Sequence, residues 1–205
     1  MFEWYRRLVF PLLCDLALDV PEVTRLRRSV LAGVEGEVLE IGFGTGLNAP
    51  CYPPTVRAIT TVDPNVGMSR RARLRARSAG LDVRLHPLSG EKLPFPAGHF
   101  DCVVSTFTLC SIPNVGQALS EVRRVLRPGG RIVFLEHGIC PDPGVRKWQQ
   151  RLNGLEMRFL DGCHLDRDIR ALVSAEPFAS VEMAEFCLKG APKTHGWLYQ
   201  GVAVK

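Results

Sequence analysis

Three glycines at alternate positions are the first residues whose type and spacing could do chemistry. Gly42, Gly44 and Gly46 directly follow the apolar stretch 38–41. Only residues without a Cβ adopt positive φ cheaply and let a ligand lie against the backbone, so this spacing predicts a ligand-binding turn. A dinucleotide-binding fingerprint would have its third glycine where Leu47 stands, and no Walker lysine follows.

Two carboxylates flank this turn along the chain. Glu40, just before it, would repel a phosphate and attract a cation. Asp63 ends a second apolar stretch, 58–62, and an acid about 20 residues past the glycines accepts hydrogen bonds from ribose hydroxyls in doubly wound folds. A nucleoside with a charged amine and no phosphate fits both acids, and S-adenosylmethionine is such a molecule. The alternative, a structural glycine turn with a surface Asp63, explains less of the pattern.

At these positions and several others the chain resembles the class I S-adenosylmethionine-dependent methyltransferases. Within them it most resembles the small-molecule branch that includes quinone and phospholipid methyltransferases and the animal thiol S-methyltransferases. The segments that carry the generic resemblance are 39–46, 62–65, 90–91, 101–111 and 121–130. Those that resemble the thiol methyltransferases are 136–137, 160–163 and 199–205. The resemblance covers most of the chain from about Glu37 onward.

The resemblance implies which residues contact S-adenosylmethionine, including those at the end of the stretch 100–105, which should lie beside the transferable methyl group. The expected contacts are Glu40, Gly42, Phe43, Gly44, Thr45, Gly46, Asn48, Asp63, Pro64, Asn65, Met68, Ser89, Gly90, Glu91, Ser105, Thr106 and Phe107. Many relatives carry an acid at position 89 that binds the adenine amino group. Ser89 offers only a neutral hydroxyl, so we expect backbone atoms to take over that contact.

Methyl transfer from a sulfonium ion is an in-line displacement, so positioning in a dry pocket can supply most of the catalysis without a metal. A thiol, with a pKa of roughly 8.5, needs only modest help to ionise. The candidate bases are His137, after the stretch 131–136, and His164 with Asp161 in a later loop. A structural role stays open for each, and Asp161 could instead cap the following helix. His137 and Asp142 are interpreted as loop residues rather than magnesium ligands, so the sequence predicts no metal site.

Composition predicts one globular domain, because 205 residues of which 46% are hydrophobic suffice for a full core. A net charge of +5 would suit an anionic membrane or nucleic acid. The densest basic cluster, at 70–77, wraps around an expected helix without interleaved aromatic residues, so we expect a solvated helix and no nucleic-acid partner. The N-P-P-[YF] motif of base amino methylation is also absent after the fourth expected strand.

Seven cysteines, an odd number with no C-x-x-C spacing, indicate reduced thiols rather than a disulfide framework or a zinc knuckle. We therefore expect a cytoplasmic protein, and the resemblance implies that it acts on a small-molecule acceptor. Peripheral contact with a membrane through the N-terminal helix stays open, as does the oligomeric state.

Apolar residues at three- and four-residue steps predict an amphipathic N-terminal helix kinked at Pro11. These residues are Phe2, Tyr5, Val9, Leu12 and Leu16. The run is too short to span a bilayer, and Asp15 and Asp19 within it disfavour a signal peptide. A lid over the substrate pocket, an interfacial membrane helix and core packing are the alternatives, of which we favour the lid. Asp19 should cap a second helix that ends near Ala32.

Along the rest of the chain, apolar stretches alternate with helical patterns, which predicts a parallel sheet with right-handed crossovers. Expected strands are 38–41, 58–63, 83–86, 100–105, 131–136, 180–187 and 196–204, and expected helices are 64–78, 115–126, 145–159 and 165–174. The apolar stripe of 145–159 is interpreted as core packing. The resemblance implies a doubly wound α/β, Rossmann-like sheet of seven strands, mostly parallel with an antiparallel last strand. We expect N-terminal helices over residues 1–34 and a methyltransferase domain over residues 35–205.

Three functions compete. Segments 136–137 and 160–163 favour a methyltransferase whose acceptor is a small thiol or sulfide. The basic charge and apolar N-terminal helix favour a lipid-like acceptor, either phosphatidylethanolamine or a quinone. A non-catalytic S-adenosylmethionine-binding module is disfavoured by the intact glycine turn and by Asp63 and Glu91.

Overall fold

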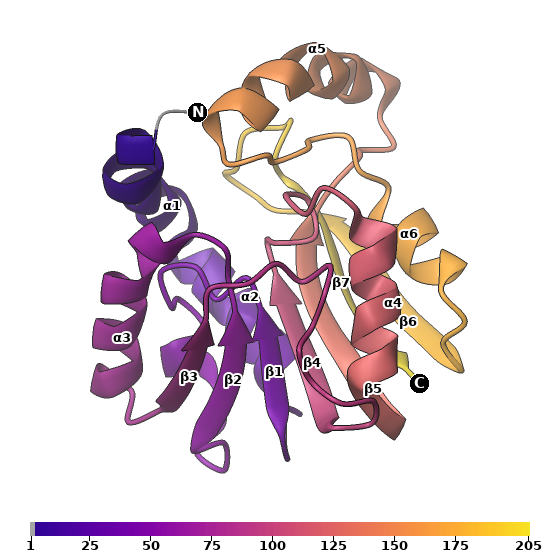
Figure 1. The fold of residues 1–205 in the computed structure, drawn as a ribbon. Coiled ribbons are helices and arrows are strands. Elements are labelled where there is room, and N and C mark those ends of the chain that lie inside the picture. The colour runs from indigo at the N-terminus through magenta and orange to yellow at the C-terminus, as the bar shows by residue number, and fades with distance from the viewer. Residues whose placement is uncertain (1–2) are drawn as a thin grey trace.

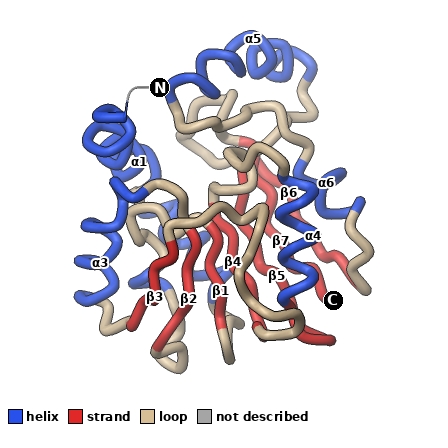
Figure 2. The backbone as a smooth tube through the Cα atoms, viewed as in Figure 1, coloured by secondary structure: helices blue, strands red, loops and turns tan. Residues whose placement is uncertain are grey.

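The computed structural model describes residues 3–205 and shows one seven-stranded sheet with helices on both faces (Figure 1, Figure 2). The strand order is β3-β2-β1-β4-β5-β7-β6. The strands are β1 Val38–Ile41, β2 Ala58–Val62, β3 Asp82–His86, β4 Phe100–Thr106, β5 Leu126–His137, β6 Ser180–Cys187 and β7 Trp197–Val204. The first five pair in parallel, while β7 is antiparallel to both β5 and β6. The expected fold, with its antiparallel last strand, is confirmed.

The helices divide between the two faces of the sheet. They are α1 Phe10–Leu18, α2 Pro21–Leu31, α3 Ser69–Ser78, α4 Val115–Val125, α5 Pro143–Phe159 and α6 Ile169–Ala175. Helices α4 and α6 share a hydrophobic core with Leu39 and Val103, whereas α2 and α3 share a second core with Val38 and Val104. Adjacent residues of one strand thus enter opposite cores, which is why β1 and β4 are apolar without alternation.

Helix α1 is held against α3 by ion pairs. Its Asp15 lies 2.7 Å from Arg71 and 2.9 Å from Arg75, and accepts a hydrogen bond from the Thr45 hydroxyl at 2.6 Å. Burial acts against ionisation, but the hydrogen bonds from Arg75 and Thr45 lower the pKa of Asp15 below its ordinary value. The arginine cluster expected on a solvated helix therefore includes two residues that fix the N-terminal helix in place.

None of the described residues in the apolar stripe predicted for the N-terminal helix is buried. Leu12 and Leu16 are exposed, whereas Phe10 and Pro11 are the buried residues of α1; Phe2 lies outside the described residues. Core packing of the stripe is therefore wrong. The expected Asp19 cap is also wrong, because its carboxylate pairs with Arg75 and no side chain caps α2. Where the sequence predicted a kink at Pro11, the structure has a π-helical turn, Tyr5–Val9, directly before α1.

Helix α5 also exposes its apolar stripe, so core packing is wrong there too. Trp148, Leu155 and Phe159 are each at least half exposed, and the one buried side chain described in α5 is that of Gln149. Both α1 and α5 lie beyond the carboxyl ends of the parallel strands (Figure 1). None of the helices in residues 3–205 is long and apolar enough to cross a membrane.

Strand β5 begins earlier than expected. Leu126 pairs with Phe100 and Arg131 with Cys102, so residues 127–130 form a bulge within the strand instead of a separate turn. Gly129 permits this bulge by adopting a φ of 77°. Beyond the bulge the register is regular, and it brings Leu135 beside Thr106 at the end of β4, where the site lies.

Candidate active site

A cavity of about 650 Å³ lies at the carboxyl ends of β1, β2 and β4, where the strand order reverses. Open α/β sheets bind ligands at this place. The expected cofactor residues that line it are Glu40, Gly42, Phe43, Gly44, Thr45, Asp63, Pro64, Asn65, Met68, Ser89, Gly90, Glu91, Thr106 and Phe107. Three others, Gly46, Asn48 and Ser105, do not line it.

The outer wall of the cavity comes from the N-terminal helix and the end of α5. Phe10 and Cys14 contribute from α1, and Met157 and Arg158 from α5. These side chains line the same cavity as the glycine turn, so two helices that follow or precede the parallel strands also bound the space for a ligand.

The glycine turn has the positive φ angles that its composition predicts. Gly42, Gly44 and Gly46 have φ of 72°, 56° and 83°. A Cβ on Gly42 would come within 2.1 Å of the Thr108 side chain, whereas one on Gly44 would meet nothing closer than 3.4 Å. Gly42 therefore permits close packing against the turn after β4, and Gly44 presents bare backbone to the cavity.

Asp63 is tied to the glycine turn through hydrogen bonds. Its Oδ2 accepts from the Gly44 N–H at 2.8 Å, and its Oδ1 accepts from the Asn65 N–H at 2.7 Å. Burial raises the pKa of Asp63, and these two hydrogen bonds oppose that rise. Each oxygen keeps a further lone pair, so the carboxylate can accept two adjacent hydroxyls of a ribose.

A buried polar network lies at the inner end of the cavity. Glu40 accepts hydrogen bonds from the Asn48 amide at 2.7 Å and the Tyr52 hydroxyl at 2.6 Å. Arg27 donates to Asn48 at 2.7 Å and to Thr106 at 2.8 Å. Burial raises the pKa of Glu40 to about 7, although the hydrogen bonds and Arg27 oppose that rise.

Arg27 was not identified from the sequence. A signal did exist: a charged residue stands on the apolar face of α2, together with Val23 and Val30, and that face is buried. The Arg27 guanidinium lies 5.2 Å from the Phe107 ring and lines the cavity, and its Nε has no hydrogen-bond partner within residues 3–205. Glu40 and Arg27 are an acid and a base that both hydrogen-bond to Asn48 and both line the cavity. This pair fits the ammonium and carboxylate of the methionine part of S-adenosylmethionine.

At the other end of the cavity, the segment 89–91 is held by its own side chains. The Ser89 hydroxyl donates to Glu91 at 2.8 Å, and Glu91 also accepts from the Asn114 N–H at 2.7 Å. A Cβ on Gly90 would lie 2.9 Å from the Ile41 side chain. The Ser89 hydroxyl is thus engaged within the protein, and the surrounding backbone is exposed to the cavity.

Of the three expected catalytic residues, only Asp161 lines the cavity. It forms an ion pair with Arg6 at 2.8 Å and accepts a hydrogen bond from Asn65 at 3.0 Å. Its φ of 50° is unusual for a residue other than glycine, and the cap of α6 is Asp168 instead. His164 does not line the cavity and lies 3.5 Å from the Asn153 amide.

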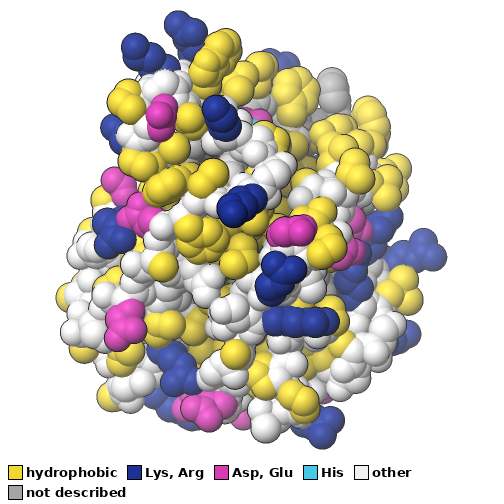
Figure 3. Space-filling view, turned by 180° about the vertical axis from the view of Figure 1, so that it is seen from behind, with side chains coloured by type: hydrophobic (Ala, Val, Ile, Leu, Met, Phe, Trp, Pro, Cys, Tyr) yellow, Lys and Arg dark blue, Asp and Glu magenta, His cyan; other side chains and the backbone are white. Residues whose placement is uncertain are grey.

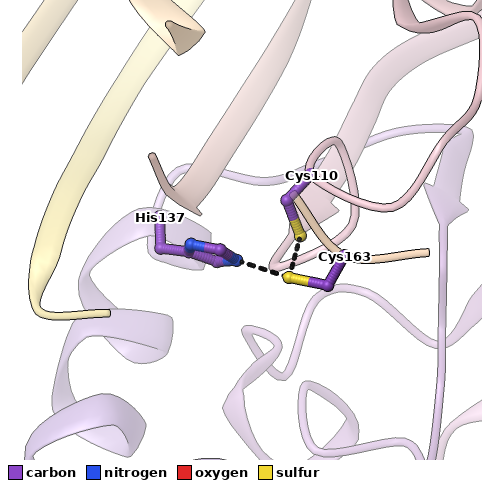
Figure 4. A group of neighbouring side chains, drawn as sticks. All are labelled: Cys110, His137 and Cys163. Atoms are coloured by element: carbon purple, nitrogen blue, oxygen red, sulfur yellow. Dashed lines mark hydrogen bonds between the residues drawn. The ribbon is translucent and has the colours of Figure 1, made fainter. Parts of the chain in front are cut away.

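His137 also does not line the cavity, and it belongs to a buried group with two cysteines (Figure 4). Its Nε2 lies 3.2 Å from the sulfur of Cys163, which lies 3.7 Å from the sulfur of Cys110. The hydrogen bond from Cys163 and the neighbouring imidazole lower the pKa of Cys110 against the effect of burial. The sequence missed this group because its members come from three distant segments with no recognisable spacing.

Comparisons with known proteins agree with this geometry. A family model described as a methyltransferase domain matches residues 39–134. A thiol S-methyltransferase, TMT1B, of Rattus norvegicus is 34% identical over 177 residues, which are 83% of this chain and 70% of that protein. A phosphatidylethanolamine N-methyltransferase of Cereibacter sphaeroides is 38% identical over 104 residues, which are 50% of this chain and 51% of that protein.

A solved structure has the same fold. It is an S-adenosylmethionine-dependent methyltransferase of Thermotoga maritima, described as a possible histamine N-methyltransferase. The two chains superpose over their full lengths with a TM-score of 0.71 at 20% identity. At that identity the likeness concerns the fold and not the acceptor.

Proposed function

This chain belongs to the S-adenosylmethionine-dependent methyltransferases, and we propose that it methylates the sulfur of a small thiol or sulfide. The observation that carries the proposal is the extent of the similarity to the rat thiol S-methyltransferase. An alignment of 177 residues must reach well beyond the domain at 39–134, into the segments that form the acceptor side. The similarity to the phosphatidylethanolamine enzyme spans only 104 residues.

In this proposal the inner surfaces of the cavity hold the cofactor. When bound, S-adenosylmethionine supplies a methyl group on a positively charged sulfur. Asp63 accepts hydrogen bonds from the ribose hydroxyls, and Glu40 and Arg27 hold the charged ends of the methionine part. The segment 89–91 would hold the adenine, and the end of β4, at Thr106, would border the space for the methyl group.

The acceptor side of the cavity supports a nucleophile that ionises without strong help. Phe10, Ile112 and Met157 give it apolar surface. Among the described residues that line the cavity there is no histidine, and Asp161 is already paired with Arg6. A thiol, a few per cent ionised at neutral pH, needs only desolvation and orientation from such a site, whereas an alcohol requires a stronger base.

The experiment is release of S-adenosylhomocysteine by the purified protein with a panel of acceptors. The panel contains hydrosulfide, alkyl and aryl thiols, a quinol and vesicles of phosphatidylethanolamine. We expect release with the thiols only, and slower release from Asp63→Asn at cofactor concentrations that just saturate the wild type. Release that requires the quinol or the vesicles would overturn the thiol assignment.

A lipid-like acceptor reached from a membrane surface is the second candidate. The two elements that form the outer wall of the cavity also carry exposed apolar side chains: Trp4, Leu8, Leu12 and Leu16 in and before α1, and Trp148, Leu155 and Phe159 on α5. Seen from behind, hydrophobic side chains gather toward the end of the molecule where these helices lie (Figure 3). Together with the net charge of +5, this surface favours contact with anionic lipid.

Co-sedimentation with anionic vesicles tests this candidate. The variant Leu8→Gln/Leu12→Gln/Leu16→Gln changes exposed positions only, and a matched control replaces the exposed Leu74 of α3 by Gln. Binding that the triple variant loses and the control keeps would support membrane contact. Absence of binding by the wild type would contradict it and leave α1 as a lid alone.

A further inference from the structure

Two thiols and one imidazole that the proposed methyl transfer does not use converge behind the cavity wall (Figure 4). Cys110 comes from the turn after β4, His137 from the end of β5 and Cys163 from the loop after α5. Their ligand atoms lie within 4.8 Å of one another, and all three residues are buried. We infer that Cys110, His137 and Cys163 form a binding site for a soft metal ion, with zinc as the expected occupant.

Two of the three distances are already close to those between ligands of one ion. Zinc binds thiolates at about 2.3 Å and imidazole at about 2.0 Å in a tetrahedron, which separates two sulfurs by about 3.8 Å and a sulfur from a nitrogen by about 3.5 Å. The sulfurs of Cys110 and Cys163 are 3.7 Å apart, and Nε2 of His137 is 3.2 Å from Cys163. A disulfide would instead require the sulfurs to approach to about 2.05 Å.

The backbone around the ligands is fixed by hydrogen bonds on both sides. Glu136 accepts from the N–H groups of Thr108 at 2.9 Å and Leu109 at 3.2 Å, which holds the turn that carries Cys110 against β5. The carbonyl oxygen of Cys110 accepts from the N–H of His164 at 3.0 Å, which joins it to the residue after Cys163. Ligands held in this way need little rearrangement to bind an ion.

Charge and hydrogen bonding also favour an ion at this place. Two thiolates, a neutral imidazole and Zn²⁺ sum to zero, so the complex can be buried without an uncompensated charge. The two thiol protons would pass to solvent on binding. Without an ion, Nε2 of His137 has only a thiol as partner, and Nδ1 has none within residues 3–205.

The site lies directly behind the acceptor side of the cavity. Ser111 and Gly162, the neighbours of Cys110 and Cys163, line the cavity, while the two cysteines do not. An ion therefore ties together two segments of that wall. Three protein ligands also leave the fourth tetrahedral position for water or another small ligand.

The first test is metal content after equilibration of the reduced protein with Zn²⁺ and removal of loose metal on a chelating resin. We expect one zinc per chain in the wild type and in the control Cys140→Ser, which changes a buried cysteine outside the group. Cys110→Ser and Cys163→Ser should bind zinc far more weakly, by more than the roughly 10–100-fold that loss of an outer-sphere partner causes.

A second test uses the wild type alone, so it does not depend on the folding of variants. Titration with Co²⁺ should give thiolate-to-metal charge-transfer absorption and the visible bands of tetrahedral cobalt. Bound zinc should protect Cys110 and Cys163 from alkylation, as read by mass spectrometry, while the exposed Cys187 stays reactive.

Three outcomes would overturn the inference. In the first, the reduced wild-type protein retains no zinc. In the second, the zinc content is equal in the wild type and all variants. In the third, Cys110 and Cys163 form a disulfide, and the protein binds no metal after this disulfide is reduced. The last would identify a redox pair instead. Because these measurements involve no methyl transfer, their failure would leave the thiol-acceptor proposal unchanged.

Discussion

Glu40 is a buried acid whose ionisation should control cofactor affinity. Burial raises its pKa to about 7, and only the ionised form attracts the ammonium of S-adenosylmethionine. The ammonium itself, like other α-amino groups, stays charged below about pH 7.7. Affinity should therefore rise roughly tenfold between pH 5.5 and 7, as the ionised fraction of Glu40 rises.

Isothermal titration at several pH values measures this effect. Glu40→Gln keeps the size of the side chain and removes the charge, so its affinity should be weaker and nearly constant over the same range. A wild-type affinity that does not change with pH, or a variant with the same slope, would remove Glu40 from the recognition of the ammonium.

Asp63 gives a second prediction at the scale of one residue. Asp63→Asn removes an acceptor that the Gly44 and Asn65 N–H groups share with the ribose. Hydrogen bonds to charged groups contribute about 1.5–3 kcal/mol, so affinity for S-adenosylmethionine should fall roughly 10–100-fold. The exposed Asp82→Asn at the start of β3 is the control, and an equal loss in both variants would argue against a specific role.

At the scale of residues, the sequence predicted those site residues whose role can be recognised from their neighbours along the chain. The glycine turn and the acid at the end of a strand can each be recognised within one short segment. The structure brings Gly44 and Asp63 within hydrogen-bonding distance. Arg27 was missed because it comes from a helix before the motif, and its role depends on a buried network. The geometry of His137 could not be inferred because its partners lie 27 and 26 residues away along the chain.

At the scale of elements, the docking of α1 on α3 depends on Asp15. Asp15→Asn should lose the ion pairs with Arg71 and Arg75, at a cost of roughly 2 kcal/mol. For a chain of this length that corresponds to a fall in Tm of roughly 4–8 °C. Limited proteolysis should also cleave residues 3–18 faster, because the helix is released from its neighbour.

Asp19→Asn is the matched control, since Asp19 is exposed and contacts Arg75 at 3.2 Å only. An exposed pair contributes within about 1 kcal/mol, so this variant should behave nearly as the wild type does. The docking role of Asp15 would be contradicted if both variants showed the same proteolysis rate and the same Tm.

The strands were predicted well because strands buried on both faces appear as short apolar runs with clear ends. The apolar stripe of α5 was assigned to the wrong environment, and for α1 the sequence left core packing open as an alternative to the favoured lid. Periodicity identifies a stripe but does not say whether that stripe faces the sheet or the solvent. In α1 the buried face is that of Phe10, and in α5 it is the polar Gln149 that enters the interior.

At the scale of the whole molecule, the cavity lacks an imidazole along its described lining, so the acceptor itself should set the pH dependence. The pH profile of kcat/KM should follow the pKa of the thiol supplied, and two thiols of different pKa should give two displaced profiles. With S-adenosylmethionine saturating at every pH, so that the titration of Glu40 does not limit the rate, an inflection that stays near pH 6.5 for both thiols would instead indicate a histidine base in the protein.

The most direct measurement is a competition. The enzyme receives S-adenosylmethionine with a labelled methyl group in one reaction that contains an alkyl thiol, a quinol and phosphatidylethanolamine vesicles, and mass spectrometry locates the label. The proposed function predicts that nearly all of the label is recovered as the thioether. Label found mainly on the lipid nitrogen or the quinol carbon would contradict it.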